Sequence, residues 1–335
     1  SFGHSRVWDK QVRLAGYEPE RIDGIWNWDV VRAEISGASR PSAIVGESNL
    51  GNSNGAKFDL TQNYLADAQR TSRATIHARH EVTSIGRASD GRYVLEVDVL
   101  DPAAIAVESR TLTCDRLFLG AGSMGTSELL VTARDTGALP RLNEHVGQGW
   151  GTNGDAALVR GMSPEGNGLV QASPSASRIF DESGAPVTLE NWYVPGSPID
   201  MSLIGSLGMV LDPTRGEFVY DRDTGATRLR WPERGNRNVE EALRAVHTRI
   251  AHRSNIGVGF PMLGVPDVNA TFTAHPLGGA VLGRATDAFG RVIGYDGLYV
   301  VDGALVPGST GAVNPSLTIA ALAERNIEEI IASGR

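Results

Sequence analysis

Hydrophobic and polar positions follow two periods along the chain, and these periods predict a mixture of helices and strands. Helices are predicted where apolar residues recur every three to four positions, at residues 7–14, 60–69, 126–132, 239–250 and 316–333. Strands are predicted from alternation or from short apolar runs, at residues 74–78, 81–85, 92–99, 110–114, 116–119, 203–211, 216–220 and 298–301. Residues 39–55 and 302–315 are rich in Ser, Gly, Asn and Pro, which is typical of loops.

Composition narrows the class of protein. The 335 residues are 41% hydrophobic and 21% charged, as is usual for a soluble globular chain, and the compartment, secreted or cytoplasmic, stays open. A formal net charge of −8 gives a nucleic-acid partner no electrostatic support. Cys114 is the single cysteine, which excludes an internal disulfide and a metal site built from several cysteines. No apolar run reaches the ~18 residues of a transmembrane segment.

One glycine motif matches the dinucleotide-binding fingerprint by spacing. Gly120, Gly122 and Gly125 follow the predicted strand 116–119 and precede the predicted helix 126–132, as that fingerprint requires. The acidic strand end expected about 20 residues later is absent, because residues 137–154 are turn-like. Three interpretations remain open: a pyrophosphate site, a turn beside a cofactor held mainly elsewhere, or a tight strand-to-helix connection.

The end of the chain carries a dense succession of motifs. They are Phe272-x-x-His275-Pro276-Leu277-Gly278-Gly279, Ala285-Thr286-Asp287-x-x-Gly290-Arg291-Val292, Leu298-Tyr299-Val300-Val301-Asp302-Gly303-x-x-x-Pro307-Gly308-Ser309, Asn314-Pro315 and Ala323-Glu324-Arg325-Asn326. Upstream stretches that agree with them are Phe118-Leu119-Gly120-Ala121-Gly122-Ser123 and Val146-Gly147-x-Gly149-Trp150-Gly151-x-Asn153-Gly154. This series resembles the glucose–methanol–choline (GMC) oxidoreductases, and within them the bacterial cholesterol oxidases.

The resemblance implies an α/β fold with α+β character. It implies part of an FAD-binding domain in residues 46–150 and 266–335, and a substrate domain with a mainly antiparallel sheet covered by helices in residues 1–45 and 151–265. The amino-terminal GxGxxG unit that binds the ADP part of FAD in this family has no counterpart here. We therefore expect that unit to be a separate or cleaved companion chain, a piece missing from a truncated sequence, or dispensable in a protein that works without flavin.

Three residues are candidates for catalysis. His275 carries an imidazole, a group that can accept or position a proton; by composition alone, a histidine in a glycine-rich turn could equally be structural. The amide of Asn314 can donate to a substrate oxygen, or it can form a turn before Pro315. Glu190 has apolar neighbours, so burial would raise its pKa, and the resemblance implies that it moves a proton between steroid carbons 4 and 6; a surface position is the alternative.

The resemblance also implies cofactor contacts. The residues implied to contact FAD are Val82, at the adenine, and Gly120, Ala121, Gly122, Asp302, Gly303, Asn314, Pro315 and Ser316. Asn153 is implied to lie beside Asn314 on an oxygen route. No metal site is expected.

Three functions are compatible with these residues. The first is FAD-dependent oxidation of a secondary alcohol, a sterol-like 3β-hydroxysteroid in the family's default, with O2 reduced to H2O2 and a possible Δ5→Δ4 isomerisation. The second is flavin-independent isomerisation of a ketosteroid-like substrate by Glu190 and His275, because proton abstraction next to a carbonyl needs no cofactor. The third is a non-catalytic remnant that binds a lipid or a partner chain.

Overall fold

The protein is described by a computed structural model that covers residues 3–160, 171, 173–193, 204–255, 261–263 and 272–334. Two compact units make up the chain, and each collects three separate segments. Unit 1 comprises Ser1–Ile76, Asp155–Val210 and Arg237–Phe272. Unit 2 comprises His77–Gly154, Leu211–Asn236 and Thr273–Arg335.

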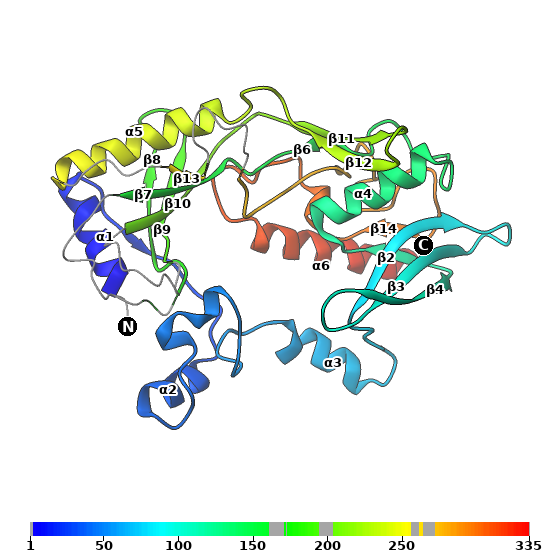
Figure 1. The fold of residues 1–335 in the computed structure, drawn as a ribbon, viewed down its shortest axis with the longest axis horizontal. Helices are drawn as coiled ribbons and strands as arrows, with labels where there is room; N and C mark the ends of the chain where they lie inside the picture. The colour runs from blue at the N-terminus through cyan, green and yellow to red at the C-terminus, as the bar shows by residue number, and fades with distance from the viewer. Residues whose placement is uncertain are drawn as a thin grey trace. The chain divides into compact units, whose positions relative to one another are not determined.

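A six-stranded antiparallel sheet forms the centre of unit 1 (Figure 1), with strand order β1-β8-β9-β10-β7-β13. Its strands are β1 Glu20–Arg21, β7 Asp155–Arg160, β8 Ser177–Asp181, β9 Val187–Asn191, β10 Ile204–Val210 and β13 Pro261–Leu263. Helices α1 (Gly3–Leu14) and α5 (Arg237–Arg253) pack against each other and against this sheet. Trp8, Leu189 and Leu243 are buried between them, so the apolar faces predicted from the sequence form this core.

The remainder of unit 1 consists of short helices. They are α2 Trp28–Ser36, η1 Ala43–Val45, η2 Glu47–Asn49, η3 Leu60–Gln62 and α3 Tyr64–Arg70. Helix α2 was not predicted, although the Asn27 side chain accepts a hydrogen bond from the Val30 amide at its start and left-handed Gly37 ends it. The helix predicted from Leu60 begins at Tyr64 instead, because Asn63 has a non-helical backbone after the 3-10 turn.

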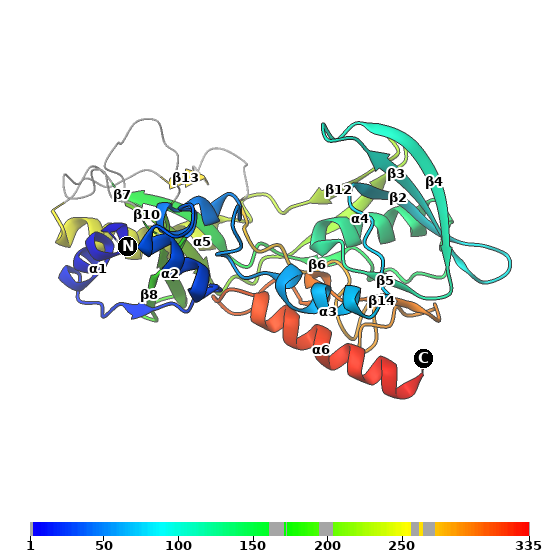
Figure 2. The same cartoon turned by 90° about the horizontal axis from the view of Figure 1, so that it is seen from below.

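Unit 2 combines a parallel strand pair with two three-stranded sheets. Strands β5 (Leu117–Leu119) and β14 (Leu298–Val300) are the parallel pair. The antiparallel sheets are β2 His80–Arg87, β3 Tyr93–Leu100 and β4 Ala106–Cys114, and β6 Gln148–Trp150, β11 Gly216–Asp221 and β12 Ala226–Arg230. Helices α4 (Gly122–Asp135) and α6 (Ser316–Ser333) and the turn η5 (Gly303–Leu305) complete the unit. Figure 2 shows α4 beside the β2–β3–β4 sheet, with which it is in contact.

The observed elements confirm the predicted mixed α/β class with antiparallel sheets. One predicted strand is wrong: residues 74–77 have no regular secondary structure, residue 78 is in a turn, and the whole segment is exposed and outside every sheet. Alternation alone did not make a strand there, because no neighbouring strand supplies hydrogen bonds. In the part of the chain that the structure describes, no helix is long and apolar enough to cross a membrane.

Candidate active site

Asp302 joins the two turns that follow the parallel strands of unit 2. The chain leaves β5 through Gly120 and Ala121, and α4 begins at Gly122, whose φ of 74° is left-handed. The Gly122 amide donates to Asp302 Oδ2 at 2.9 Å, and Thr126 Oγ1 donates to the same oxygen at 2.6 Å. The Ala304 amide donates to Asp302 Oδ1 at 2.8 Å. One carboxylate therefore fixes both the β5–α4 turn and the segment after β14.

Burial changes the acidity of this carboxylate. Desolvation raises the pKa of Asp302 above its usual range, and the hydrogen bonds from Thr126, Ala304 and Gly122 act in the opposite direction. Three of its lone-pair positions are already occupied by protein donors. Asp302 is thus a structural anchor for the two turns, with room for one more donor.

His275 lies in a segment that is held by its own neighbours. Thr273 Oγ1 donates to the Thr152 carbonyl at 3.0 Å, and the His275 amide donates to Thr273 Oγ1 at 2.9 Å. Leu277 and Gly151 exchange two backbone hydrogen bonds, at 2.9 and 3.1 Å. The backbone on both sides of the half-buried imidazole is therefore fixed.

The glycines after His275 are required by close packing. Gly278 and Gly279 have φ values of 88° and 104°. An added Cβ would lie 2.1 Å from the Gly149 carbonyl oxygen at Gly278, and 1.8 Å from Ser127 Oγ at Gly279. Ser123 Oγ of α4 also donates to the Gly278 carbonyl at 2.7 Å. The motif thus passes between β6 and α4, and these close approaches are made to protein rather than to a ligand.

Asn314 is exposed and stands directly before Pro315 and α6. The loop leading to it is held by Asn153, a fully buried residue with a left-handed φ of 58°. Asn153 Nδ2 donates to the Val313 carbonyl at 2.9 Å, and its Oδ1 accepts from the Thr310 amide at 2.9 Å and from Thr310 Oγ1 at 3.1 Å. Both ends of the Asn153 amide are therefore engaged by the loop.

Thr152 and Asn153 together bring the two candidate motifs to one place. Thr152 accepts from the segment that leads into His275, and Asn153 holds the loop that leads into Asn314. The Gly278 amide also donates to the Gly303 carbonyl at 3.0 Å. Thr152 was not singled out from the sequence, since only contacts across more than a hundred residues reveal its part.

The start of α6 is open to a ligand. No side chain caps this helix, and Ser316 and the two residues after it are exposed. Uncapped amides at a helix N-terminus point outward and favour negative charge. The helix thus offers backbone donors immediately beside Asn314 and Pro315.

Two predicted site residues belong to other elements. Glu190 belongs to β9 of unit 1, where it is 3% exposed and pairs in register with Leu207. Val82 lies in β2 of unit 2, at a register shift between Val82 and Ser84. Among the described residues, no group of His, Cys, Asp or Glu side chains could hold a metal ion.

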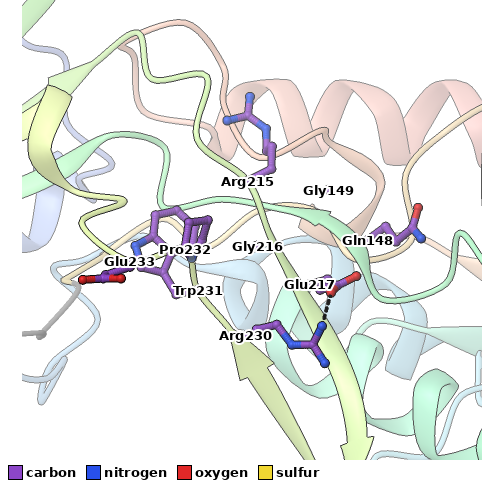
Figure 3. Close-up of a pocket in the computed structure, with 9 residues that line it drawn as sticks. All are labelled: Gln148, Gly149, Arg215, Gly216, Glu217, Arg230, Trp231, Pro232 and Glu233. Atoms are coloured by element: carbon purple, nitrogen blue, oxygen red, sulfur yellow. Dashed lines mark hydrogen bonds and ion pairs between the residues drawn. The ribbon is translucent and has the colours of Figure 1, made fainter.

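A surface groove of 480 Å³ lies beside β6 (Figure 3). Glu217 and Arg230, which line it, form an ion pair at 3.0 Å, while the Arg215 guanidinium points away from Trp231. Arg215 Nε donates to the Pro307 carbonyl at 2.7 Å. Arg215 therefore supports the loop before Asn314 from the side of β11.

Comparison with known proteins agrees with this arrangement. Residues 227–323 match the sequence profile of the GMC oxidoreductases. A cholesterol oxidase of Mycobacterium tuberculosis (strain CDC 1551 / Oshkosh) is 28% identical, with 81% of this chain and 56% of the relative covered. A cholesterol oxidase of Acinetobacter baumannii is 26% identical, with 82% and 58% covered. The chain thus spans little more than half the length of these relatives.

Solved structures share the fold at low identity. An FAD-dependent oxidoreductase from Chaetomium thermophilum gives a TM-score of 0.60 at 13% identity, over 84% of this chain and 65% of that one. A fungal aryl-alcohol oxidase gives a TM-score of 0.56 at 15% identity, over 83% of this chain and 64% of that one. Residues 227–323 of the chain thus resemble the GMC oxidoreductases. The relatives that match most of its length are cholesterol oxidases.

Proposed function

We propose that this chain is the carboxyl-terminal catalytic part of an FAD-dependent oxidase of secondary alcohols. The observation that carries the proposal is the junction at Thr152 and Asn153, which joins the His275 segment to the loop before Asn314. The match of residues 227–323 to the GMC profile and the names of the relatives support the reaction class. The amino-terminal nucleotide-binding unit would come from a companion chain or from another part of a longer protein.

The residues of unit 2 fit an FAD. The exposed amides at the start of α6 suit the pyrimidine edge of the flavin, where negative charge develops on reduction. The turn of Gly120, Ala121 and Gly122 after β5, and Asp302 with Gly303 after β14, would lie along the ribityl–phosphate chain. Val82, at the β2 bulge, would offer its backbone to the adenine. These contacts are expected from family resemblance, and the open donors are their structural support.

In the proposed reaction, His275 accepts or positions the proton of the substrate hydroxyl. The Asn314 amide donates to the same oxygen and stabilises the charge that develops there. The flavin supplies the hydride acceptor that no side chain can provide. Asn153 fixes the loop of Asn314 and would also border the route of O2, which is reduced to H2O2.

The substrate that we propose is a sterol-like 3β-hydroxysteroid. Glu190 is buried on β9, in register with Leu207, which pairs in turn with Ala157 of β7. Arg178 of β8 is the in-register neighbour of Glu190 on its other side. Burial suits a carboxyl group that takes a proton from carbon 4 and returns it to carbon 6. This Δ5→Δ4 isomerisation would follow oxidation at the 3-hydroxyl.

The alcohol-oxidase proposal is tested with the chain, FAD and a separately supplied amino-terminal unit of a relative. We expect flavin absorbance in the complex and peroxide release with a 3β-hydroxysteroid. His275→Ala should lower kcat by roughly 100-fold or more without loss of flavin, and Asn314→Ala should also lower kcat. The matched control is His77→Ala, an exposed histidine of unit 2. A complex that stays colourless, or a fully active His275→Ala, would overturn the proposal.

The isomerisation is tested separately with a Δ5-3-ketone and flavin-free protein. Formation of the conjugated enone gives an ultraviolet band that reports proton transfer without oxidation. Glu190→Gln should abolish this band and leave peroxide release with the alcohol largely intact. If enone formation survives in Glu190→Gln, Glu190 is not the base.

The companion unit is tested by measuring intact masses and size on native material. We expect a second component of ~15–20 kDa, the size of a small domain, or a longer polypeptide that contains this chain.

A further inference from the structure

A polar cluster is buried in the core of unit 1, between the sheet and helices α1 and α5. Its centre is Arg160, the last residue of β7, which is 0% exposed. Arg160 Nε donates to Gln11 Oε1 at 2.8 Å, and Nη1 donates to Ser206 Oγ at 3.2 Å. Trp8 Nε1 donates to the same Ser206 oxygen at 2.8 Å, and its ring lies 5.8 Å from the guanidinium carbon.

No carboxylate of the described residues pairs with this guanidinium, and burial alone lowers the pKa of Arg160 to about 9. The side chain is therefore still a cation at neutral pH. A buried charge without a counter-charge opposes folding, because it has lost its hydration without gaining an attraction in return. Proteins normally meet that cost by pairing the charge with an opposite one.

Further polar atoms around Arg160 are buried without a hydrogen-bond partner. They are Arg160 Nη2, Gln11 Nε2, His4 Nδ1 and His247 Nδ1. Gln11 uses its oxygen to accept from Arg160, so its amide nitrogen is left as a donor. His4 Nε2 accepts from the Gly205 amide at 3.3 Å, so the neutral ring carries its proton on Nδ1 and is also a donor.

His247 differs from these three groups. Its Nε2 faces the Val159 carbonyl at 2.9 Å and must donate, which leaves Nδ1 as a bare acceptor. Burial lowers the pKa of both His4 and His247 to about 4, and the charge of Arg160 contributes a smaller part of this decrease. Both rings are consequently neutral near pH 7. The cluster therefore has one positive charge without a counter-charge. It also has three donor groups without an acceptor, on Arg160, Gln11 and His4.

We propose that this cluster is an anion site that holds one small monovalent anion, a halide or a carboxylate group, between Arg160, Gln11 and His4. The three residues are 0%, 3% and 5% exposed, so the anion would be enclosed and small. Two of them belong to α1 and one to β7. The bound anion would therefore fasten α1 to the sheet, and its exchange would require α1 to move. This site lies in unit 1 and is independent of the proposed oxidase activity.

The test is thermal unfolding of the full chain at constant ionic strength, with chloride or acetate replacing a bulky sulfonate such as the HEPES anion. An anion that binds only the folded state stabilises it in proportion to ln(1 + [L]/Kd). We expect Tm to rise logarithmically with the probe above its dissociation constant. A larger rise with chloride than with acetate assigns the site to a halide, and the reverse assigns it to a carboxylate. Crystals grown in bromide should then show an anomalous peak beside Arg160 Nη2 if the halide is preferred.

Two substitutions and a control make the test specific. Arg160→Met removes the charge and keeps the apolar stem, so the dependence on the probe should disappear. Gln11→Glu places a carboxylate on the guanidinium, so Tm in probe-free buffer should rise and the dependence should again disappear. Arg178→Met, on β8 of the same sheet, removes an arginine that is paired with Glu20, and the dependence should persist.

The outcomes that overturn the proposal are equally definite. One is a wild-type chain whose Tm responds to neither probe more than Arg160→Met does. Another is electron density in which water alone fills the space beside Arg160 Nη2 at a high concentration of the preferred anion. If Arg160→Met does not fold, Gln11→Glu decides the question by itself.

Discussion

At the scale of single residues, side chains that support the site are as important as those at its surface. Asn153 uses both ends of its amide to hold the loop before Asn314. Its left-handed backbone is one that asparagine tolerates better than most residues. Both properties make Asn153 a positioning residue for Asn314, in addition to any role on an oxygen route.

Replacing Asn153 by glycine separates these two properties, because glycine keeps the backbone conformation and loses the amide. We expect Asn153→Gly to reduce the free energy of unfolding by about 1–3 kcal/mol. The Thr310 amide loses its acceptor, and the Val313 carbonyl keeps only its bond from Thr310 Oγ1. Urea unfolding measures this loss, and hydrogen exchange should show faster exchange within residues 308–313. Asn143→Gly is the control, because Asn143 bonds to the Arg284 carbonyl instead; equal exchange in both variants would contradict the assignment.

A second residue-scale prediction concerns Gly279. A methyl group there would meet Ser127 Oγ at 1.8 Å on a backbone with φ of 104°, so strain and overpacking combine. Gly279→Ala should lower the free energy of unfolding by about 3 kcal/mol or more. Gly283 has a φ of 72° with nothing within 4 Å of an added Cβ, so Gly283→Ala should cost only about 1 kcal/mol. Equal losses would mean that backbone strain alone matters.

At the scale of elements, helices α1 and α5 each carry a buried histidine toward the sheet of unit 1. The pKa values of His4 and His247 fall from 6.5 to about 4, mainly through burial. The folded state therefore binds fewer protons than the unfolded chain between those two pH values. The packing of both helices is consequently sensitive to acid.

Because the unfolded chain binds more protons than the folded state below pH 6.5, acid favours unfolding. Stability should be constant above about pH 6.5 and decrease as the pH falls toward 4, by about 3 kcal/mol for each histidine. His247→Gln should remove about half of the decrease, as measured by the free energy of unfolding between pH 7.5 and 4. His77→Gln, which changes an exposed residue of unit 2, should leave the decrease unchanged. An acid profile that is identical in His247→Gln and the wild type would contradict the prediction.

Sequence patterns predicted the longer elements well, and physical reasons explain the misses. Helix α5 and strands β3, β5 and β14 have strong periodic or continuous apolar patterns, so burial decides their structure. Helix α6 was predicted from its long apolar period, although only Asn326 and Ile330 are buried. Helix α2 was missed because its nine residues are too few to show a clear apolar period. Residues 74–78 alternate without pairing, which only the structure could reveal.

At the scale of the whole molecule, the site depends on contacts that no local pattern contains. The sequence motifs identified His275, Asn314 and Asp302, and their assigned roles remain predictions. The hydrogen bond from Thr273 to the Thr152 carbonyl joins segments separated by more than a hundred residues, and so does the packing of Gly278 on Gly149. The anion cluster was also invisible in the sequence, because Gln11, Arg160 and Ser206 meet only through tertiary folding.

The pairing of β5 with β14 has a consequence for synthesis on the ribosome. β5 ends at Leu119, whereas its parallel partner begins at Leu298, so β5 leaves the exit tunnel long before that partner has been translated. Asp302, whose carboxylate accepts a hydrogen bond from the turn after β5, is likewise translated only after β14. A nascent chain that has not reached Asp302 therefore carries an unfinished site, and the proposed chemistry can start only after Leu298 and Asp302 have been translated.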